Sequence, residues 1–213
     1  MKRKKWKIVL LILMILVLVA GITLFLGLRG KETGRLGKCV FYVFDRKEGT
    51  AIIFGFGGMW DFLVGHTEDF LVEGEIAPAE PDPPFYFTHD DSPKKVIVME
   101  GVTELSAQLF QGCSAMEVVY LPSTVRDVDM MAFFGSWELK EVYFSGDAPE
   151  FTVGARLRLY RELEGITFEA QNAFVDIYPT IYHKPGTTGW DDPIWEGYTV
   201  VEKDFKVDYS PVK

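Results

Sequence analysis

Two consecutive 23-residue segments, residues 96–118 and 119–141, carry the same hydrophobic pattern, and this repeat restricts the fold more than any other feature of the sequence. When they are aligned, Val96 meets Val119 and Phe110 meets Phe133. The further matching pairs are Val98 with Leu121, Val102 with Val125, Leu105 with Val128, Gly112 with Gly135 and Met116 with Leu139. Each unit contains a short alternating strand, a turn and a second apolar segment that ends in glycine. A fixed period of this kind predicts a solenoid of stacked coils.

The number of coils is small, so the ends of the solenoid need caps. A third unit begins at Val142-Tyr143-Phe144, and a looser one at Ile166-Thr167-Phe168. One coil cannot bury its own apolar face, and about three are needed for a stable array. We therefore expect a β-hairpin over residues 39–57, where two β-rich runs flank the polar turn DRKEG, to cap one end. The aromatic tail is expected to cap the other end, with Trp190, Trp195 and Tyr198 in its core.

The repeat region resembles the BspA-type leucine-rich-repeat proteins of bacterial and protist surfaces. The resemblance rests on VTELSAQLFQGCSAMEVVYLPSTVRDVDMMAFFGSWELKEVYF, with a strand, a Pro-Val turn, an Ala-Phe pair and Gly or Cys. GTAIIFGFGGMWDF resembles the hairpin that precedes the repeats in that family, and PTIYHKPGTTGWDDPIWEGY resembles its closing strand. The departures are Leu109-Phe110 in place of Ala-Phe, Ser136 in place of Cys, and an insertion in GARLRLYRELEGITFEAQNAF. The resemblance implies adhesion or binding of a protein or glycan by the sheet face, without catalysis and without a cofactor.

Together these observations predict a β-rich α/β leucine-rich-repeat solenoid, with short strands and short helical or irregular returns. A β-hairpin cap and an N-terminal transmembrane helix precede the repeats. The expected divisions are a cytoplasmic tail (1–7), a transmembrane signal anchor (8–28), a solvated stalk (29–38), a hairpin cap with a Pro-rich loop (39–95), the leucine-rich repeats (96–168) and a closing strand with a cap (169–213).

The run from Ile8 to Leu28 contains 21 residues without a charge. At about 1.5 Å per residue it spans roughly 30 Å, the thickness of the hydrocarbon core of a bilayer. A cleaved signal peptide is the alternative, but its apolar region is usually about 7 to 15 residues long and ends in a small-x-small site. Five basic residues within positions 2–7 place the N-terminus in the cytoplasm by the positive-inside rule. The domain after the anchor is then expected outside the plasma membrane of a bacterial cell.

Net charge limits the classes of partner, and the number of cysteines limits the possible disulfides. Residues 31–213 carry 16 basic and 31 acidic side chains, a net charge of −15, which argues against nucleic acid and anionic lipid as partners of this part of the chain. The two cysteines, Cys39 and Cys113, leave one disulfide open, but we expect both to be small buried hydrophobic residues.

No motif of a known catalytic class stands out. His66, His89 and His183 are isolated in the sequence, so no metal site is predicted. Asp127 with Asp129 and Asp191 with Asp192 are carboxylate pairs that a glycosidase could use if they lay about 5 to 9 Å apart. Acidic pairs at turns are common, and we expect the protein not to be an enzyme.

The repeat register selects one candidate binding face. If Val96, Val119 and Val142 face the core, strand alternation sends Ile97, Tyr120 and Tyr143 to the opposite, exposed face of the sheet. Equivalent positions of stacked coils lie about 4.8 Å apart, so these side chains form a ladder of the type enriched at binding interfaces. The flanking candidates are Lys95 and Glu141. The alternative is that the tyrosines are β-formers that pack on each other or under the long loop.

Three functions remain open at this stage. The first is a membrane-anchored module that binds a protein or glycan ligand through the ladder. The second is an extracytoplasmic hydrolase or carbohydrate-processing accessory that uses the acidic pairs. The third is a structural spacer that binds nothing.

Overall fold

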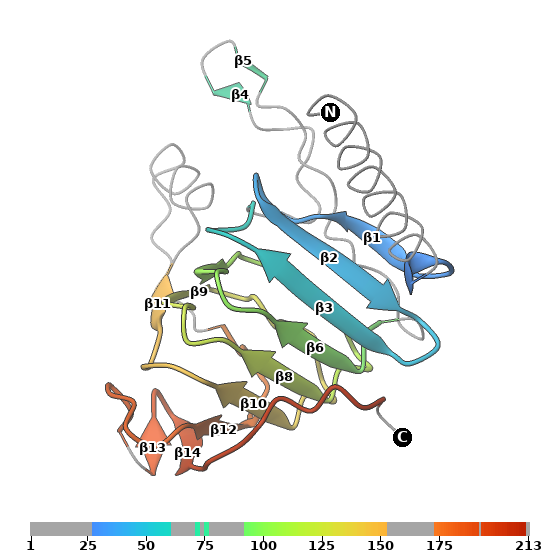
Figure 1. Cartoon of the computed structure of the whole chain (residues 1–213). Helices are drawn as coiled ribbons and strands as arrows, with labels where there is room; N and C mark the ends of the chain where they lie inside the picture. Colours follow the sequence, from blue (N-terminus) through green and yellow to red (C-terminus); the bar gives the residue numbers. More distant parts are fainter. Residues whose placement is uncertain are drawn as a thin grey trace, which may run out of the picture.

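The 23-residue period of the sequence is the spacing between successive strands of a parallel sheet. Our computed structural model describes residues 27–60, 71–72, 75–76, 92–152, 173–191 and 193–211. Within them, nine strands form the main sheet in the order β1-β2-β3-β6-β8-β10-β12-β14-β13 (Figure 1). Their bounds are β1 Glu32–Arg35, β2 Val40–Asp45, β3 Thr50–Gly55, β6 Lys95–Val98, β8 Val118–Leu121, β10 Glu141–Phe144, β12 Thr180–His183, β13 Ile194–Trp195 and β14 Tyr198–Glu202.

A smaller parallel sheet runs along the second apolar segment of each coil, in the order β11-β9-β7. Its strands are β7 (Glu104–Leu105), β9 (Asp127–Asp129) and β11 (Glu150–Thr152). A separate antiparallel pair is formed by β4 (Leu71–Val72) and β5 (Glu75–Ile76). Between residues 92 and 152 the returns consist of turns and these short strands, so the helical returns that the sequence analysis allowed are replaced by turns.

The strand register confirms the predicted coils. Val96 of β6 pairs with Val119 of β8, and Val119 pairs with Val142 of β10, all in parallel strands. The backbone conformation repeats with the same period: Gln108 and Met131, which are 23 residues apart, both have φ of 59°. Hydrogen bonds also join residues 23 positions apart in neighbouring coils. They include Ser123 N to Glu100 (2.9 Å), Gly101 N to Thr124 Oγ1 (3.0 Å) and Ala115 N to Ser92 Oγ (3.1 Å).

The predicted hairpin is also confirmed. β2 and β3 pair antiparallel around the polar turn, and β3 then pairs parallel with β6, so the hairpin extends the sheet of the coils. The predicted stalk is wrong in part. Residues Glu32–Arg35 form β1, which pairs antiparallel with β2 and is the edge of the sheet. Glu32 supports this edge, since it accepts hydrogen bonds from Arg46 Nη2 (2.7 Å) and Tyr42 Oη (3.2 Å).

The core lies between the two sheets and is filled by one aromatic side chain per coil. The ring centroid of Phe133 lies 5.3 Å from that of Phe110 and 4.9 Å from that of Phe174, and all three side chains are fully buried. Cys113 is buried beside them, as predicted, and burial raises the pKa of its thiol. Cys39 is exposed, which corrects the prediction for that residue, and no disulfide joins the two cysteines.

The C-terminal end of the sheet differs from the expected repeat. The strand next to β10 is β12, which begins at Thr180. The looser fourth unit expected at 166–168 lies outside the described residues. Trp195 and Tyr198 are buried in the core, as predicted. Trp190 is partly buried, and its ring centroid lies 5.1 Å from that of Phe144.

Several sequence predictions lie outside the described residues. These are residues 1–26 with most of the predicted anchor, the Pro-rich loop at 77–84, and His66, His89 and Asp192. Among the residues that are described, no helix has the length and hydrophobicity to cross a membrane.

Candidate functional site

The predicted ladder exists, and it has one more member than the sequence analysis named. Ile97, Tyr120, Tyr143 and Tyr182 lie opposite one another on β6, β8, β10 and β12. The ring centroids of Tyr120 and Tyr143 are 4.7 Å apart, and those of Tyr143 and Tyr182 are also 4.7 Å apart. The ring planes are within 15° and 17° of parallel. Each tyrosine therefore presents a ring face to its neighbour and a ring edge outward.

The ladder is not exposed, which corrects the prediction of an open sheet face. Ile97 is 0% exposed, Tyr120 8% and Tyr143 6%. The C-terminal segment, residues 203–211, covers them, and we call this segment the tail. In Figure 1 the tail, in dark red, leaves β14 and crosses in front of β10 and β8. The alternative that these tyrosines pack on each other is confirmed, with the tail as the cover.

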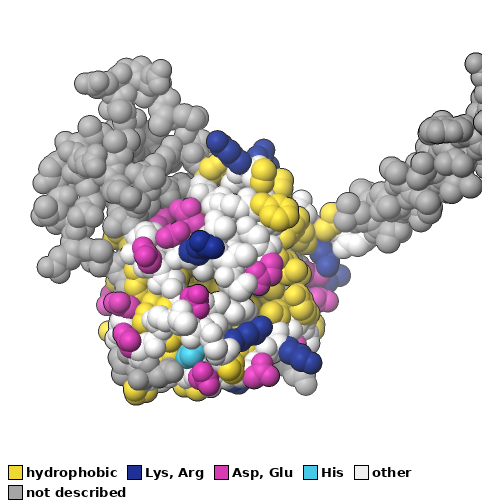
Figure 2. Space-filling model, turned by 60° about the vertical axis from the view of Figure 1, so that its left-hand side comes forward, with side chains coloured by type: hydrophobic (Ala, Val, Ile, Leu, Met, Phe, Trp, Pro, Cys, Tyr) yellow, Lys and Arg dark blue, Asp and Glu magenta, His cyan; other side chains and the backbone are white. Residues whose placement is uncertain are grey.

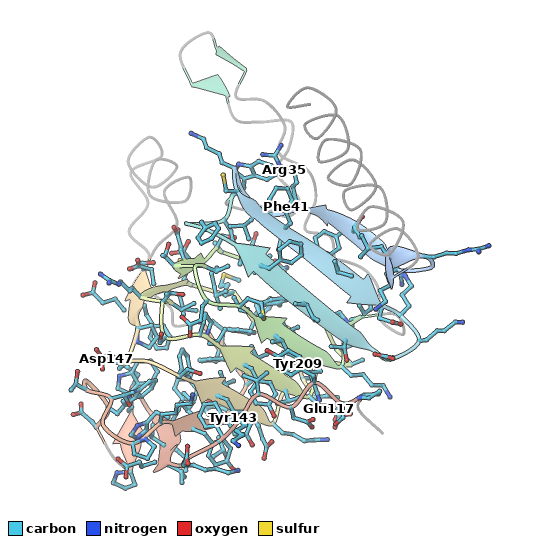
Figure 3. All side chains as sticks on the ribbon, in the orientation of Figure 1. Arg35, Phe41, Glu117, Tyr143, Asp147 and Tyr209 are labelled. Carbon is cyan, nitrogen blue, oxygen red and sulfur yellow. The ribbon has the colours of Figure 1, made fainter. Side chains whose placement is uncertain are left out.

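The tail contacts the ladder through alternate side chains. The ring centroid of Phe205 lies 4.9 Å from that of Tyr143 and 6.3 Å from that of Tyr120. Val207 packs against the same cluster, whereas Lys206 between them is exposed. Tyr209 donates a hydrogen bond to Met99 Sδ (3.7 Å), and Figure 3 shows it on the tail in front of the sheet. The tail is thus an extended segment that places every second side chain on the sheet.

Lys95 holds the far end of the tail. Its side chain is only 4% exposed, and Nζ donates hydrogen bonds to the carbonyl oxygens of Asp208 (2.9 Å) and Ser210 (2.6 Å). The Asp208 carboxylate lies 3.4 Å from the same nitrogen. A buried ammonium group is costly unless it is paired, so these three oxygens explain how Lys95 is tolerated beneath the tail.

Glu141 and Lys203 bind the near end. Tyr143 Oη donates a hydrogen bond to Glu141 Oε2 (3.0 Å), and Lys203 Nζ donates one to Tyr143 Oη (3.3 Å). Lys203 Nζ also lies 4.3 Å from the centroid of the Tyr182 ring, a cation–π contact. Burial, and then the hydrogen bond to Glu141, raises the pKa of the Tyr143 hydroxyl.

The sequence analysis missed Tyr182, Phe205 and Val207. Tyr182 lies 39 residues after Tyr143, outside the 23-residue period, although Ile181-Tyr182-His183 has the alternation of Val142-Tyr143-Phe144. In the tail, Phe205, Val207 and Tyr209 alternate with polar residues, a period-2 signal of an extended segment that packs on one side.

We expect acid to loosen the tail. The Ser210 hydroxyl and amide donate to the Asp208 carboxylate and Lys95 attracts it, so its pKa falls from 3.8 to about 2. Ser210 is part of the tail and moves with Asp208, so its hydrogen bonds do not depend on docking. Only the attraction of the carboxylate to Lys95 changes when the tail leaves the sheet. Docking is favoured while the carboxylate is ionised. The docked fraction, followed by NMR, should be constant above about pH 5 and should decrease as the pH falls from about 4 to 2. A Lys95→Met chain should lack this step, and a step that persists there would contradict the assignment.

The other candidate groups do not converge on a site in the described part of the chain. Asp129 is 1% exposed and accepts a hydrogen bond from Thr152 Oγ1, whereas its predicted partner Asp127 is half-buried. Asp191 is exposed. His183 is buried, with Nδ1 3.0 Å from Thr187 Oγ1. No group of three His, Cys, Asp or Glu side chains there could hold a metal ion.

The tail covers only part of the sheet face. On β2 and β3, Phe41 (36% exposed) and Phe54 (40% exposed) stack with centroids 6.0 Å apart, and Phe56, directly after β3, is 77% exposed. A groove of about 410 Å³ runs along these strands, lined by Leu28, Thr33, Gly34, Arg35, Phe41, Tyr42, Val43 and Phe54. We call this region the open half of the face.

Arg35 lies over aromatic rings at the open half. Its Cζ is 5.7 Å from the centroid of Phe41 and 5.4 Å from that of Trp60, and Figure 3 shows Arg35 and Phe41 side by side. Figure 2 shows another side of the molecule, where acidic and basic side chains are interspersed and hydrophobic ones gather toward the right-hand edge. The described surface in that view has no continuous region of one charge.

Comparisons with known proteins show one similarity. No protein-family model matches the chain, and no curated protein matches it. Among solved structures, it is similar to a leucine-rich repeat protein from Eubacterium ventriosum, with 19% sequence identity and a TM-score of 0.38. The match covers 74% of this chain and 39% of that protein, so the chain spans well under half of its length. The strand register and the 23-residue period of this chain establish its coils independently of that similarity.

Proposed function

We propose that this chain is a membrane-anchored recognition module that binds an extended peptide segment of a protein partner over the tyrosine ladder. Residues 8–28 anchor it in the plasma membrane, with the N-terminus in the cytoplasm and the solenoid domain outside the cell. It uses no cofactor and catalyses no reaction. The BspA-type resemblance supports a role at the cell surface.

One observation carries this proposal: the ladder is already covered by an extended segment of the chain itself. That segment uses alternate apolar side chains, Phe205 and Val207, and a terminal polar clamp by Lys95. Peptide-binding faces commonly recognise extended partners in this way, with pockets for alternate side chains. A partner with an apolar-x-apolar-Asp pattern would satisfy the same groups once the tail had left.

The ring geometry favours a peptide over a glycan. A sugar stacks on the exposed face of an aromatic ring, but Tyr120, Tyr143 and Tyr182 turn their faces toward one another. The Lys203 ammonium group lies beside two of the stacked rings, 4.3 Å from the centroid of Tyr182 and 5.2 Å from that of Tyr143. The ring edges and hydroxyls that remain suit the side chains and carbonyl oxygens of a peptide.

The test separates the tail from the folded chain. A protease site is inserted after Glu202 in the full chain, the protein is cut after folding, and the released peptide is removed. A fluorescent peptide of residues 203–213 should then bind to the cut protein and not to the uncut one. A Phe205→Ala peptide should bind about threefold to tenfold more weakly, since Phe205 is partly buried against the ladder and a fully buried phenylalanine contributes roughly 1.5–3 kcal/mol. A Lys206→Ala peptide is the matched control and should bind within about twofold of the unmodified one, because Lys206 is exposed.

Two outcomes would decide against this function. If no peptide rebinds although the cut protein keeps its circular dichroism spectrum, the ladder is internal packing, and the structural spacer becomes the better proposal. If Asp127→Asn or Asp191→Asn abolished turnover of a polysaccharide or peptide by the full chain, the hydrolase would replace it.

A further inference from the structure

The open half of the sheet face lies close along the chain to the end of the predicted anchor. Leu28, the last residue of the apolar run, lines the same groove as Phe41 and Phe54. Only three residues separate it from Glu32, where β1 begins, and Lys31 N donates a hydrogen bond to Leu28 O (3.0 Å) in a turn. Three residues can span at most about 10 Å. The strand that replaces the expected stalk therefore keeps the open half close to the end of the anchor.

The composition of the open half is that of a membrane-interface surface. Phe41 on β2 and Phe54 on β3 are large, partly exposed apolar side chains, and Phe56, which follows β3, is 77% exposed. Arg35 lies over the Phe41 ring, so that its guanidinium group is beside the apolar surface. Surfaces that lie in the membrane interface bury side chains such as Phe at the headgroup and acyl boundary, with Lys or Arg at the polar side where they meet phosphates.

The tail leaves this region free. Its contacts are with the ladder on β6 to β12, with Ile52 at the margin of the same cluster and with Met99 beyond β6. The face therefore has two regions: the ladder, which the tail covers, and the aromatic open half, which the tail does not cover.

From this position and composition we infer that the open half, residues Arg35, Phe41, Phe54 and Phe56, rests on the lipid headgroups of the membrane that holds the anchor. The inference depends on the membrane anchoring proposed above. The contact fixes the orientation of the domain, so that the solenoid coils extend away from the bilayer with the ladder accessible to a partner.

The natural exposed thiol allows a direct test in the full chain. Cys39 is exposed and its carbonyl oxygen accepts a hydrogen bond from Phe56 N (2.9 Å), whereas Cys113 is buried and protected from labelling. The full chain is reconstituted in nanodiscs of phosphatidylcholine, which has no net charge, and Cys39 carries an environment-sensitive fluorophore. Nitroxide lipids labelled near the headgroup should quench this fluorophore at least about twofold. A label on Glu138→Cys in a Cys39→Ser chain should be quenched far less, because Glu138 is four strands away, about 19 Å, beside β10.

A Phe41→Ser/Phe54→Ser chain tests the surface itself. Its Cys39 quenching should fall to the level of the Glu138 position, while Trp137→Ser, which changes an exposed aromatic residue elsewhere, should leave it unchanged. Flotation of the full chain with its lipids reports anchoring separately. Flotation without Cys39 quenching would overturn this inference alone, and failure to float would overturn the anchoring together with it. Loss of quenching with dimers in the nanodiscs would identify the open half as a contact between two copies and would also overturn the inference.

Discussion

A Phe133→Ala chain is expected to lose about 3–5 kcal/mol of unfolding free energy, the usual range for a buried phenylalanine. The Phe133 side chain is fully buried, with its ring between those of Phe110 and Phe174. Its removal leaves a cavity that two coils share, and neither neighbour can fill it without giving up its own stacking. Because domains of this size have a total stability of about 5–15 kcal/mol, the variant should be close to unfolding. The measurement is urea denaturation followed by circular dichroism.

Two further substitutions serve as controls. Trp137→Ala removes a larger ring that is 58% exposed and should change the unfolding free energy by about 0.5 kcal/mol or less. Phe133→Leu keeps most of the volume and should lose about 1.5 kcal/mol. A loss of less than about 1 kcal/mol for Phe133→Ala would mean that the stacked rings do not hold the coils together.

A Gly55→Ala chain should be destabilised by on the order of 3 kcal/mol, through backbone strain and crowding together. Gly55 has φ of +134°, a conformation that residues with a Cβ rarely adopt. A Cβ there would overlap the carbonyl oxygen of Cys39 and lie 2.9 Å from Val40 Cα. Both are backbone atoms, one in Val40 at the start of β2 and one in Cys39 just before it. The crowding is therefore relieved only if β2 and β3 separate. Thermal unfolding of the variant measures the loss.

Gly57→Ala separates the two causes. Gly57 has φ of +88°, and a Cβ there would meet nothing within 4 Å, so only the conformational strain of about 1–2 kcal/mol is expected. Equal losses for the two variants would show that strain alone determines the effect and that the approach of β2 to β3 at Gly55 is not tight.

The two proposals assign different functions to two regions of the same sheet face. The ladder has the chemistry to hold an extended peptide, and the tail shows how such a segment fits. The open half has exposed aromatic rings and a cation next to the end of the predicted anchor. If both proposals hold, the same sheet orients the domain at one edge and recognises a partner over the remaining strands.

The sequence by itself determined the coils, their register and the hairpin. Val96, Val119 and Val142 recur every 23 residues, and that spacing already places them on adjacent parallel strands. The turn DRKEG between two β-rich runs likewise identified β2 and β3. These features are local, because strand alternation and coil length are set by nearby residues, so a pattern in the sequence is sufficient to predict them.

Only the tertiary structure decided which surfaces are open. The sequence placed Tyr120 and Tyr143 on the outer face correctly, but it could not show that a segment more than 60 residues later covers them. Lys95 and Asp208 pair across 113 residues, and Tyr182 joins the ladder outside the repeat period. The alternation in residues 205–209 indicates an extended segment but not the surface that it covers, because that depends on where the chain returns after the last coil.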